Sequence, residues 1–172
     1  NRALPLQSLL NNLNNIDNCG LNIPLVISID NNGTKEVKKV AEEFNWKYGI
    51  KEIVIHNEKL GLVKHFIWAG NQTKRFENVI FLEDDLLVSP ELVNYATQLI
   101  SFYKDDDEVA AASLYNPILN EETGTKFYQL EDQYDAYFLQ HPYWGNIWFK
   151  DKWLKFMDYL KTYVKKPDIL PN

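Results

Sequence analysis

Cysteine is almost absent from this sequence of 172 residues, because Cys19 is the only one. A single cysteine excludes an internal disulfide and any zinc site built from several thiolates. No apolar run is long enough to cross a membrane, and no signal peptide is visible. We therefore expect no membrane segment in this chain and a cytoplasmic location.

Positive charge is also scarce. The chain has 18 Lys and Arg against 24 Asp and Glu, which gives a formal net charge of −6. A nucleic-acid-binding surface needs clustered Lys and Arg to offset phosphates, so nucleic acid is excluded as a partner. An acidic protein that binds a phosphorylated ligand needs a cation between the two. The composition thus counts against a polyanion as partner, and any phosphorylated ligand would need a metal ion as intermediary.

Strand and helix patterns alternate along the chain, which predicts an α/β sandwich with a mainly parallel sheet. Apolar runs of strand length predict four strands, at 23–29, 52–56, 78–82 and 109–113. Apolar residues at helical spacing predict helices at 6–13, 34–44, 61–69, 89–103 and 151–163. Segment 127–148 is rich in aromatic residues, and we expect it to cover one side of the sheet. With no linker in sight, residues 1–172 are predicted to form one domain.

The strongest chemical signal is an acidic triplet, Glu83, Asp84 and Asp85, directly after the apolar strand 78–82. In open α/β sheets, ligands bind at the carboxyl ends of the strands. Three adjacent carboxylates there repel one another and lose hydration, so a cation must offset the cost. A hard divalent ion fits, because it prefers oxygen ligands and keeps positions open for substrate phosphates. Acidic runs also occur as solvated turns, and run 105–107 is predicted to be one.

Asp30 is a second candidate, because it ends the strand in Ser28-Ile29-Asp30 at the same expected edge. Its carboxylate could accept the ring N–H of a uracil. Asp is equally common in turns, where it bonds to the backbone of its own loop. Both interpretations remain open at the level of sequence.

These residues resemble the GT-A glycosyltransferase superfamily. The resemblance rests on Asn1-Arg2 before a leucine-striped helix, on the strand that ends at Asp30, and on the segment FLEDDLLVSPELVNY. It is closest to the N-acetylglucosaminyltransferases that initiate N-glycan branching, or to their bacterial relatives. It includes KHFIWAG, residues 64–70, and more loosely PYWGNIW, residues 142–148. The likeness covers roughly the whole chain and is specific around residues 61–95.

The resemblance implies a Rossmann-like, three-layer α/β/α sandwich that binds a UDP-sugar through Mn²⁺ or Mg²⁺. Such an enzyme transfers the sugar, here suggested to be N-acetylglucosamine, to a hydroxyl acceptor with inversion. By this likeness Asp85 would bind the metal directly. Asp84 would lie beside the ribose or the metal's water ligands, and Glu83 would lie beside the sugar. A eukaryotic member of this family would reside in the Golgi lumen rather than the cytoplasm.

The same resemblance assigns further donor-binding residues. Arg2 and Asp30 would contact the phosphate and uracil side of the donor, and His65 would lie near the nucleotide. His65 is also explained simply as a packing residue, since a histidine on a half-buried helix is common. Three residues of a later loop would border the sugar and the acceptor: Tyr143, Trp144 and Gly145.

The catalytic base remains unassigned by the sequence. An inverting enzyme needs an acid to deprotonate the acceptor hydroxyl. The resemblance implies that this acid follows residue 172, with Asp132 and Asp135 as alternatives inside the chain. It also implies a strand before Asn1, so we expect a domain truncated at both ends.

Three other classes of protein fit parts of the pattern. A catalytically silent nucleotide-sugar-binding or scaffolding domain would keep the fold without the base. A sugar nucleotidyltransferase has a related sheet, but the start Asn1-Arg2-Ala3-Leu4-Pro5 lacks the Gly-rich loop that holds a triphosphate. A calcium-stabilised structural domain would use the acidic triplet as a static site.

Overall fold

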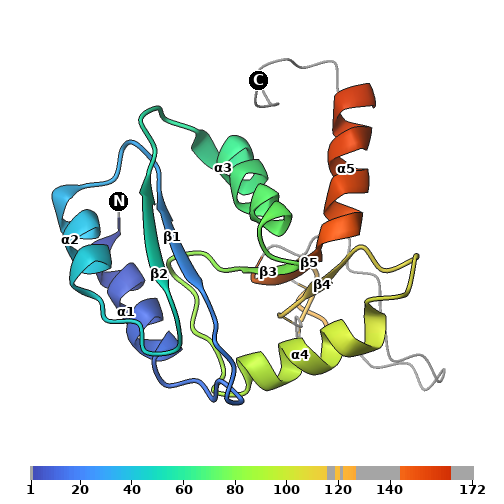
Figure 1. Ribbon diagram of the computed structural model, residues 1–172, viewed down its shortest axis with the longest axis horizontal. Helices are drawn as coiled ribbons and strands as arrows, with labels where there is room; N and C mark the ends of the chain where they lie inside the picture. Colours follow the sequence, from blue (N-terminus) through green and yellow to red (C-terminus); the bar gives the residue numbers. More distant parts are fainter. Residues whose placement is uncertain (1, 116–118, 121, 127–143, 164–172) are drawn as a thin grey trace.

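The computed structural model describes residues 2–115, 119–120, 122–126 and 144–163. These residues form a mixed α/β structure with two separate sheets (Figure 1). Strands β1 (Leu25–Ile29) and β2 (Lys51–Ile55) pair in parallel. The other sheet has the order β3-β5-β4, with both pairs antiparallel: β3 (Asn78–Phe81), β5 (Asn146–Phe149) and β4 (Ala111–Ser113). The α/β class is confirmed. The prediction of one mainly parallel sheet in a three-layer sandwich is wrong for the described residues, because only β1 and β2 pair in parallel and the separate three-stranded sheet is antiparallel.

Helices cover both faces of the β1–β2 pair. Helices α1 (Ala3–Leu13) and α2 (Lys35–Glu43) lie on one face, and α3 (Gly61–Gly70) lies on the other (Figure 1). Alternation along β1 decides which side chain meets which helix. Ile27 and Ile29 are buried in the core with the leucines of α1, whereas Ser28 points to the α3 side and bonds to it. The face toward α3 is therefore polar at this one strand position.

The second sheet packs against α4 (Leu92–Tyr103) and α5 (Lys150–Tyr163), which bury its two faces in separate apolar clusters. The prediction that the aromatic late segment covers one side of the sheet is wrong for β5. This strand lies between β3 and β4 and bonds to both. A central strand leaves no edge open to solvent, which agrees with the almost complete burial of Ile147 and Phe149.

Several boundaries differ from the sequence pattern. Helix α4 begins at Leu92 rather than at Pro90, because Ser89 forms a turn. In this turn the Ser89 carbonyl accepts from Leu92 N at 3.1 Å, and its hydroxyl accepts from Glu91 N at 3.2 Å. In the described part of the chain, no helix combines the length and apolar character that a membrane span needs.

The second acidic run is a solvated turn after α4, as predicted, but its last residue also connects two helices. Asp107 accepts from Lys152 Nζ at 2.8 Å and from Lys155 Nζ at 3.1 Å. Hydrogen bonds from Lys152 and then Lys155 lower the pKa of Asp107 to about 2. Asp107 therefore supports the placement of α5.

Candidate functional site

The acidic triplet lies where the sequence predicted, on the loop that leads from β3 to α4. Arg2, just before α1, reaches this loop and bonds to two of its carboxylates. Its Nη1 donates to Asp85 Oδ2 at 2.7 Å, and its Nη2 donates to Asp84 Oδ1. The bonds to Asp85 and Asp84 raise the pKa of Arg2. The fold thus brings Arg2 into contact with the acidic triplet, although the two are more than 80 residues apart in the sequence.

Helix α1 holds this loop in place at two further points. Asn12 Oδ1 accepts from Val88 N, and the carbonyl of Pro90 accepts from Asp17 N at 2.9 Å. Both bonds use polar groups in or just after α1, whose other face is buried in the core with its leucines. The position of the acidic triplet is therefore set by α1 as well as by β3.

Glu83 differs from its two neighbours because, among the described residues, Arg2 forms ion pairs with Asp84 and Asp85 and none with Glu83. Desolvation raises the pKa of Glu83 above its ordinary value, and the charges of Asp85 and Asp84 raise it further. The charge of Arg2 opposes these effects but does not cancel them. The folded protein thus accommodates the Glu83 anion less well than water does.

Replacing Glu83 with glutamine is expected to stabilise the protein at pH 7, by less than about 1 kcal/mol because solvent screens the repulsion. A raised pKa means that the folded state binds the proton more tightly, so the charged form opposes folding. The gain should disappear as the pH falls below 4.5, the ordinary pKa of the group, where both states are protonated. Urea denaturation at pH 7 and at a pH below 4.5 measures this difference in stability. Glu58→Gln, on an exposed loop, is the control. An equal gain in the control would contradict the explanation.

Asp85 lines a pocket of about 730 Å³. Its wall continues to Tyr95 on α4, to Tyr115 after β4, and to Trp144 and Gly145 before β5. The rings of Trp144 and Tyr115 meet edge to face with centroids 4.8 Å apart, and each residue is still more than 40% exposed, at 44% and 42%. Flat, accessible aromatic faces are suited to stacking on a sugar or a base.

Two of the three predicted loop residues line this pocket. Gly145 has a φ of 78°, a conformation that favours glycine, and its carbonyl accepts from Leu114 N at 2.9 Å. This bond fixes the loop to the end of β4 and so places Trp144 at the pocket. Tyr143 lies outside the described residues, as do Asp132 and Asp135.

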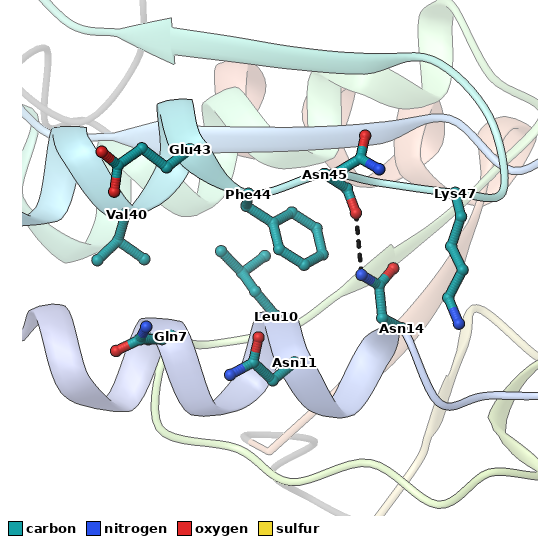
Figure 2. A pocket seen from close by; sticks show the side chains of 9 residues that line it. All are labelled: Gln7, Leu10, Asn11, Asn14, Val40, Glu43, Phe44, Asn45 and Lys47. Carbon is teal, nitrogen blue, oxygen red and sulfur yellow. Dashed lines mark hydrogen bonds between the residues drawn. The ribbon is translucent and has the colours of Figure 1, made fainter.

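A smaller pocket of about 330 Å³ lies between α1 and α2 (Figure 2). Leu10, Val40 and Phe44 form its apolar part, and amide side chains of α1 border it. Asn14 closes one end by donating to the carbonyl of Asn45 at 2.9 Å. None of the predicted site residues lines this pocket, so it is separate from the acidic triplet.

Asp30 lies at the carboxyl end of β1, as predicted, and its carboxylate is bound to backbone. Oδ1 accepts from Asn31 N and Leu60 N, both at 2.8 Å, and Oδ2 accepts from Gly61 N at 3.0 Å. Burial alone would raise the pKa of Asp30, but these backbone bonds outweigh it and the pKa is lowered. Asp30 therefore stabilises the start of α3 as an anion, and only its bond from Asn31 N belongs to the turn that the sequence suggested.

His65 lies next to Asp30, in a cluster that the sequence did not predict. Its Nε2 is 2.6 Å from Ser28 Oγ, and His56 Nε2 is 2.9 Å from the same hydroxyl. The histidine rings are edge to face with centroids 5.2 Å apart, and the ring of Trp68 packs on both. A signal for His56 existed, because it follows the strand that pairs with β1 and so lies at the same edge.

The predicted residues form two groups rather than one. Arg2, the acidic triplet and the aromatic pocket belong together, while Asp30 and His65 belong to the histidine cluster. Within the described residues, no hydrogen bond or ion pair joins the two groups, and no three His, Cys, Asp or Glu side chains converge to hold a metal. The predicted metal at Asp85 therefore stays a prediction.

Comparison with protein-family models finds no match to this chain, and comparison with curated proteins finds none. Function therefore has to be inferred from the residues of the two groups themselves.

Proposed function

We propose that this chain is the donor-binding domain of a metal-dependent, inverting glycosyltransferase of the GT-A type. In this proposal it binds a UDP-sugar and transfers the sugar, with N-acetylglucosamine as the first candidate, to a hydroxyl acceptor. The observation that carries the proposal is the position of Asp85. It lies in the acidic triplet, bonds to Arg2, and forms part of the wall of the 730 Å³ pocket.

The residues present fit a hard divalent ion in their chemistry. The side chains of Asp84 and Asp85 are 31% and 45% exposed, and each has one carboxylate oxygen that does not bond to Arg2. A cage made only of protein ligands is not needed, because Mg²⁺ is commonly bound by one or two carboxylates together with waters and substrate phosphates. When bound, such an ion neutralises the charge that develops on the diphosphate as the sugar leaves.

Arg2 and the aromatic pair supply the other contacts that a nucleotide-sugar needs. The guanidinium of Arg2 presents several N–H donors and can exchange its carboxylate partners for phosphate oxygens. Its side chain is 53% exposed and can therefore be reached by a ligand from solvent. Trp144, which lines the same pocket as Asp85, offers a flat apolar face to the sugar.

Calorimetric titration of UDP, with GDP for comparison, tests the proposal in Mn²⁺ and again in EDTA. UDP should bind only with Mn²⁺, and Asp85→Asn should weaken binding at least about tenfold, or about 1.4 kcal/mol. Asp105→Asn is the matched control, because Asp105 is an exposed acid in the turn after α4. It should leave binding unchanged.

Other outcomes of this titration favour other classes. Absence of binding of either nucleotide to the folded protein would overturn the donor-site proposal. Binding of UDP that persists in EDTA and in Asp85→Asn would contradict the proposed metal site. It would favour a silent nucleotide-sugar-binding domain. Binding of Ca²⁺ that no nucleotide changes would favour a static structural site at the acidic triplet.

A further inference from the structure

Helix α1 presents a largely polar row of side chains to its neighbour α2. Gln7, Leu10, Asn11 and Asn14 follow one another at intervals of three and four residues, so they share one face of the helix. Such a face is normally apolar where it meets another helix. Here the row lines the pocket of about 330 Å³ between the two helices (Figure 2). The helices therefore leave a groove rather than a closed apolar seam.

The amides of this row have unused hydrogen-bonding groups. Gln7 and Asn11 are exposed, and in the described part of the chain neither side chain makes a hydrogen bond. The bond from Asn15 Nδ2, at 3.1 Å, goes to the backbone carbonyl of Asn11. Asn14 donates to Asn45, but its Oδ1 is buried and has no donor. Each amide carries an NH₂ group and a carbonyl oxygen, so the rim of the groove can both donate and accept.

The floor of the groove is apolar, and the charges around it balance. Leu10 on α1, Val40 on α2 and Phe44 at the end of α2 point into the space between the helices (Figure 2). Glu43 and Lys47 add one charge of each sign to the lining. The groove therefore combines an apolar floor with a neutral polar rim and no net charge.

These properties match a neutral sugar ring. A phosphate or carboxylate group needs net positive charge, and here the carboxylate of Glu43 offsets Lys47. A wholly apolar ligand would remove water from the amides without replacing its hydrogen bonds. A pyranose ring has apolar C–H groups on a face and hydroxyls around its edge, and each hydroxyl donates and accepts as an amide does. The volume is at the lower end of the roughly 300–1,000 Å³ of small-molecule pockets, which suits a single ring.

We propose that the groove between α1 and α2 binds one neutral sugar unit of a glycan, with hydroxyls bonded to Gln7 and Asn11 and C–H groups packed on Phe44. This site is separate from the pocket at Asp85 and Trp144, because no residue lines both pockets. The site itself depends only on the groove. Its use rests on the proposed function, because a glycosyltransferase gains affinity for a glycan acceptor from a second sugar contact away from the reacting hydroxyl.

Proton–nitrogen NMR spectra of the whole chain, without nucleotide or Mn²⁺, test the site with the methyl glycosides of glucose, galactose, mannose and N-acetylglucosamine. At millimolar concentration, at least one of them should shift the side-chain amide signals of Gln7 and Asn11 saturably. Methyl glucuronide, which has a carboxylate in place of the hydroxymethyl group, should bind no more tightly than methyl glucoside. Inorganic phosphate should leave these signals unchanged.

Two variants test the roles of the amides. Gln7→Leu and Asn11→Leu should each weaken the binding of the glycoside about tenfold, the upper range for one lost hydrogen bond. Both residues are exposed, and the spectra show directly whether each variant is folded. Gln98→Leu is the matched control, because Gln98 is an exposed glutamine on α4. It should leave the affinity for the glycoside unchanged.

Several results would overturn the site. These are the absence of saturable shifts at Gln7 and Asn11 with all of the glycosides, shifts confined to Tyr115, Trp144 and their neighbours, and tighter binding of methyl glucuronide or phosphate. Equal affinity of the wild type and both leucine variants would overturn the roles of the amides. The titration of UDP is independent of these spectra. If UDP fails to bind while a glycoside binds in the groove, the proposed function fails and the sugar site stands.

Discussion

Gly70→Ala is expected to lower the free energy of unfolding by about 3 kcal/mol or to prevent folding, since overpacking at a rigid site is costly. A Cβ at this position would lie 2.0 Å from Cζ2 and 2.1 Å from Cη2 of Trp153. Trp153 has no exposed surface and is enclosed by other aromatic rings: Phe66, Phe81, Trp148 and Phe156. The indole cannot move aside without displacing that cluster. Thermal and urea denaturation of the wild type and of Gly70→Ala measure this loss of stability.

A double-mutant cycle isolates the cause. In a Trp153→Leu background the alanine should cost much less, because the smaller side chain leaves room for the added methyl group. Trp153→Leu by itself is expected to destabilise the protein through the cavity it creates. An equal cost of Gly70→Ala in both backgrounds would show that the clash with the indole is not its cause.

Asp30→Ala is expected to have the second largest effect, with a loss of about 3 kcal/mol of stability at pH 7. The substitution removes the acceptor of three backbone N–H groups, from Asn31, Leu60 and Gly61. Two of them are at the start of α3, where no other side chain caps the helix. Asp30→Asn retains one carbonyl oxygen and should lose less. Asp105→Ala, on an exposed turn, is the control for removing an acidic residue.

The pH dependence gives a second measure of the same interaction. Because the pKa of Asp30 is lowered from 3.8 by folding, its contribution is fully present above pH 3.8 and is lost as the pH falls through the lower folded value. Wild type and Asp30→Ala should therefore converge in stability in strong acid. Urea midpoints that differ equally at pH 7 and pH 2 would contradict this explanation.

These two substitutions also separate stability from function. Gly70 is the last residue of α3, and His65 is the one predicted site residue on that helix. Asp30 belongs both to the structure of α3 and to the predicted donor-binding residues. Binding measurements on Asp30 variants are therefore best made with Asp30→Asn, under conditions where the protein is shown to be folded.

Much of the local structure could be predicted from the sequence. Apolar runs such as 25–29 and 78–81 are strands because branched and aromatic side chains in a row suit a buried strand. The helix at 34–44 was also predicted, and it begins with Thr34 as its cap, whose hydroxyl accepts from Val37 N. What could not be predicted was the partner of each strand, because the pairing of β5 with both β3 and β4 joins residues far apart in sequence.

The candidate site divides in the same way. By itself, the sequence determined that the acidic triplet follows a strand, that Asp30 ends another, and that run 105–107 is a turn, since these depend on neighbouring residues. Only the tertiary structure decided that Arg2 bonds to Asp84 and Asp85, and that Ser28 joins His56 to His65. Such contacts depend on how α1 and α3 pack on β1. That packing is the sum of many weak apolar contacts, which no short segment of the sequence contains.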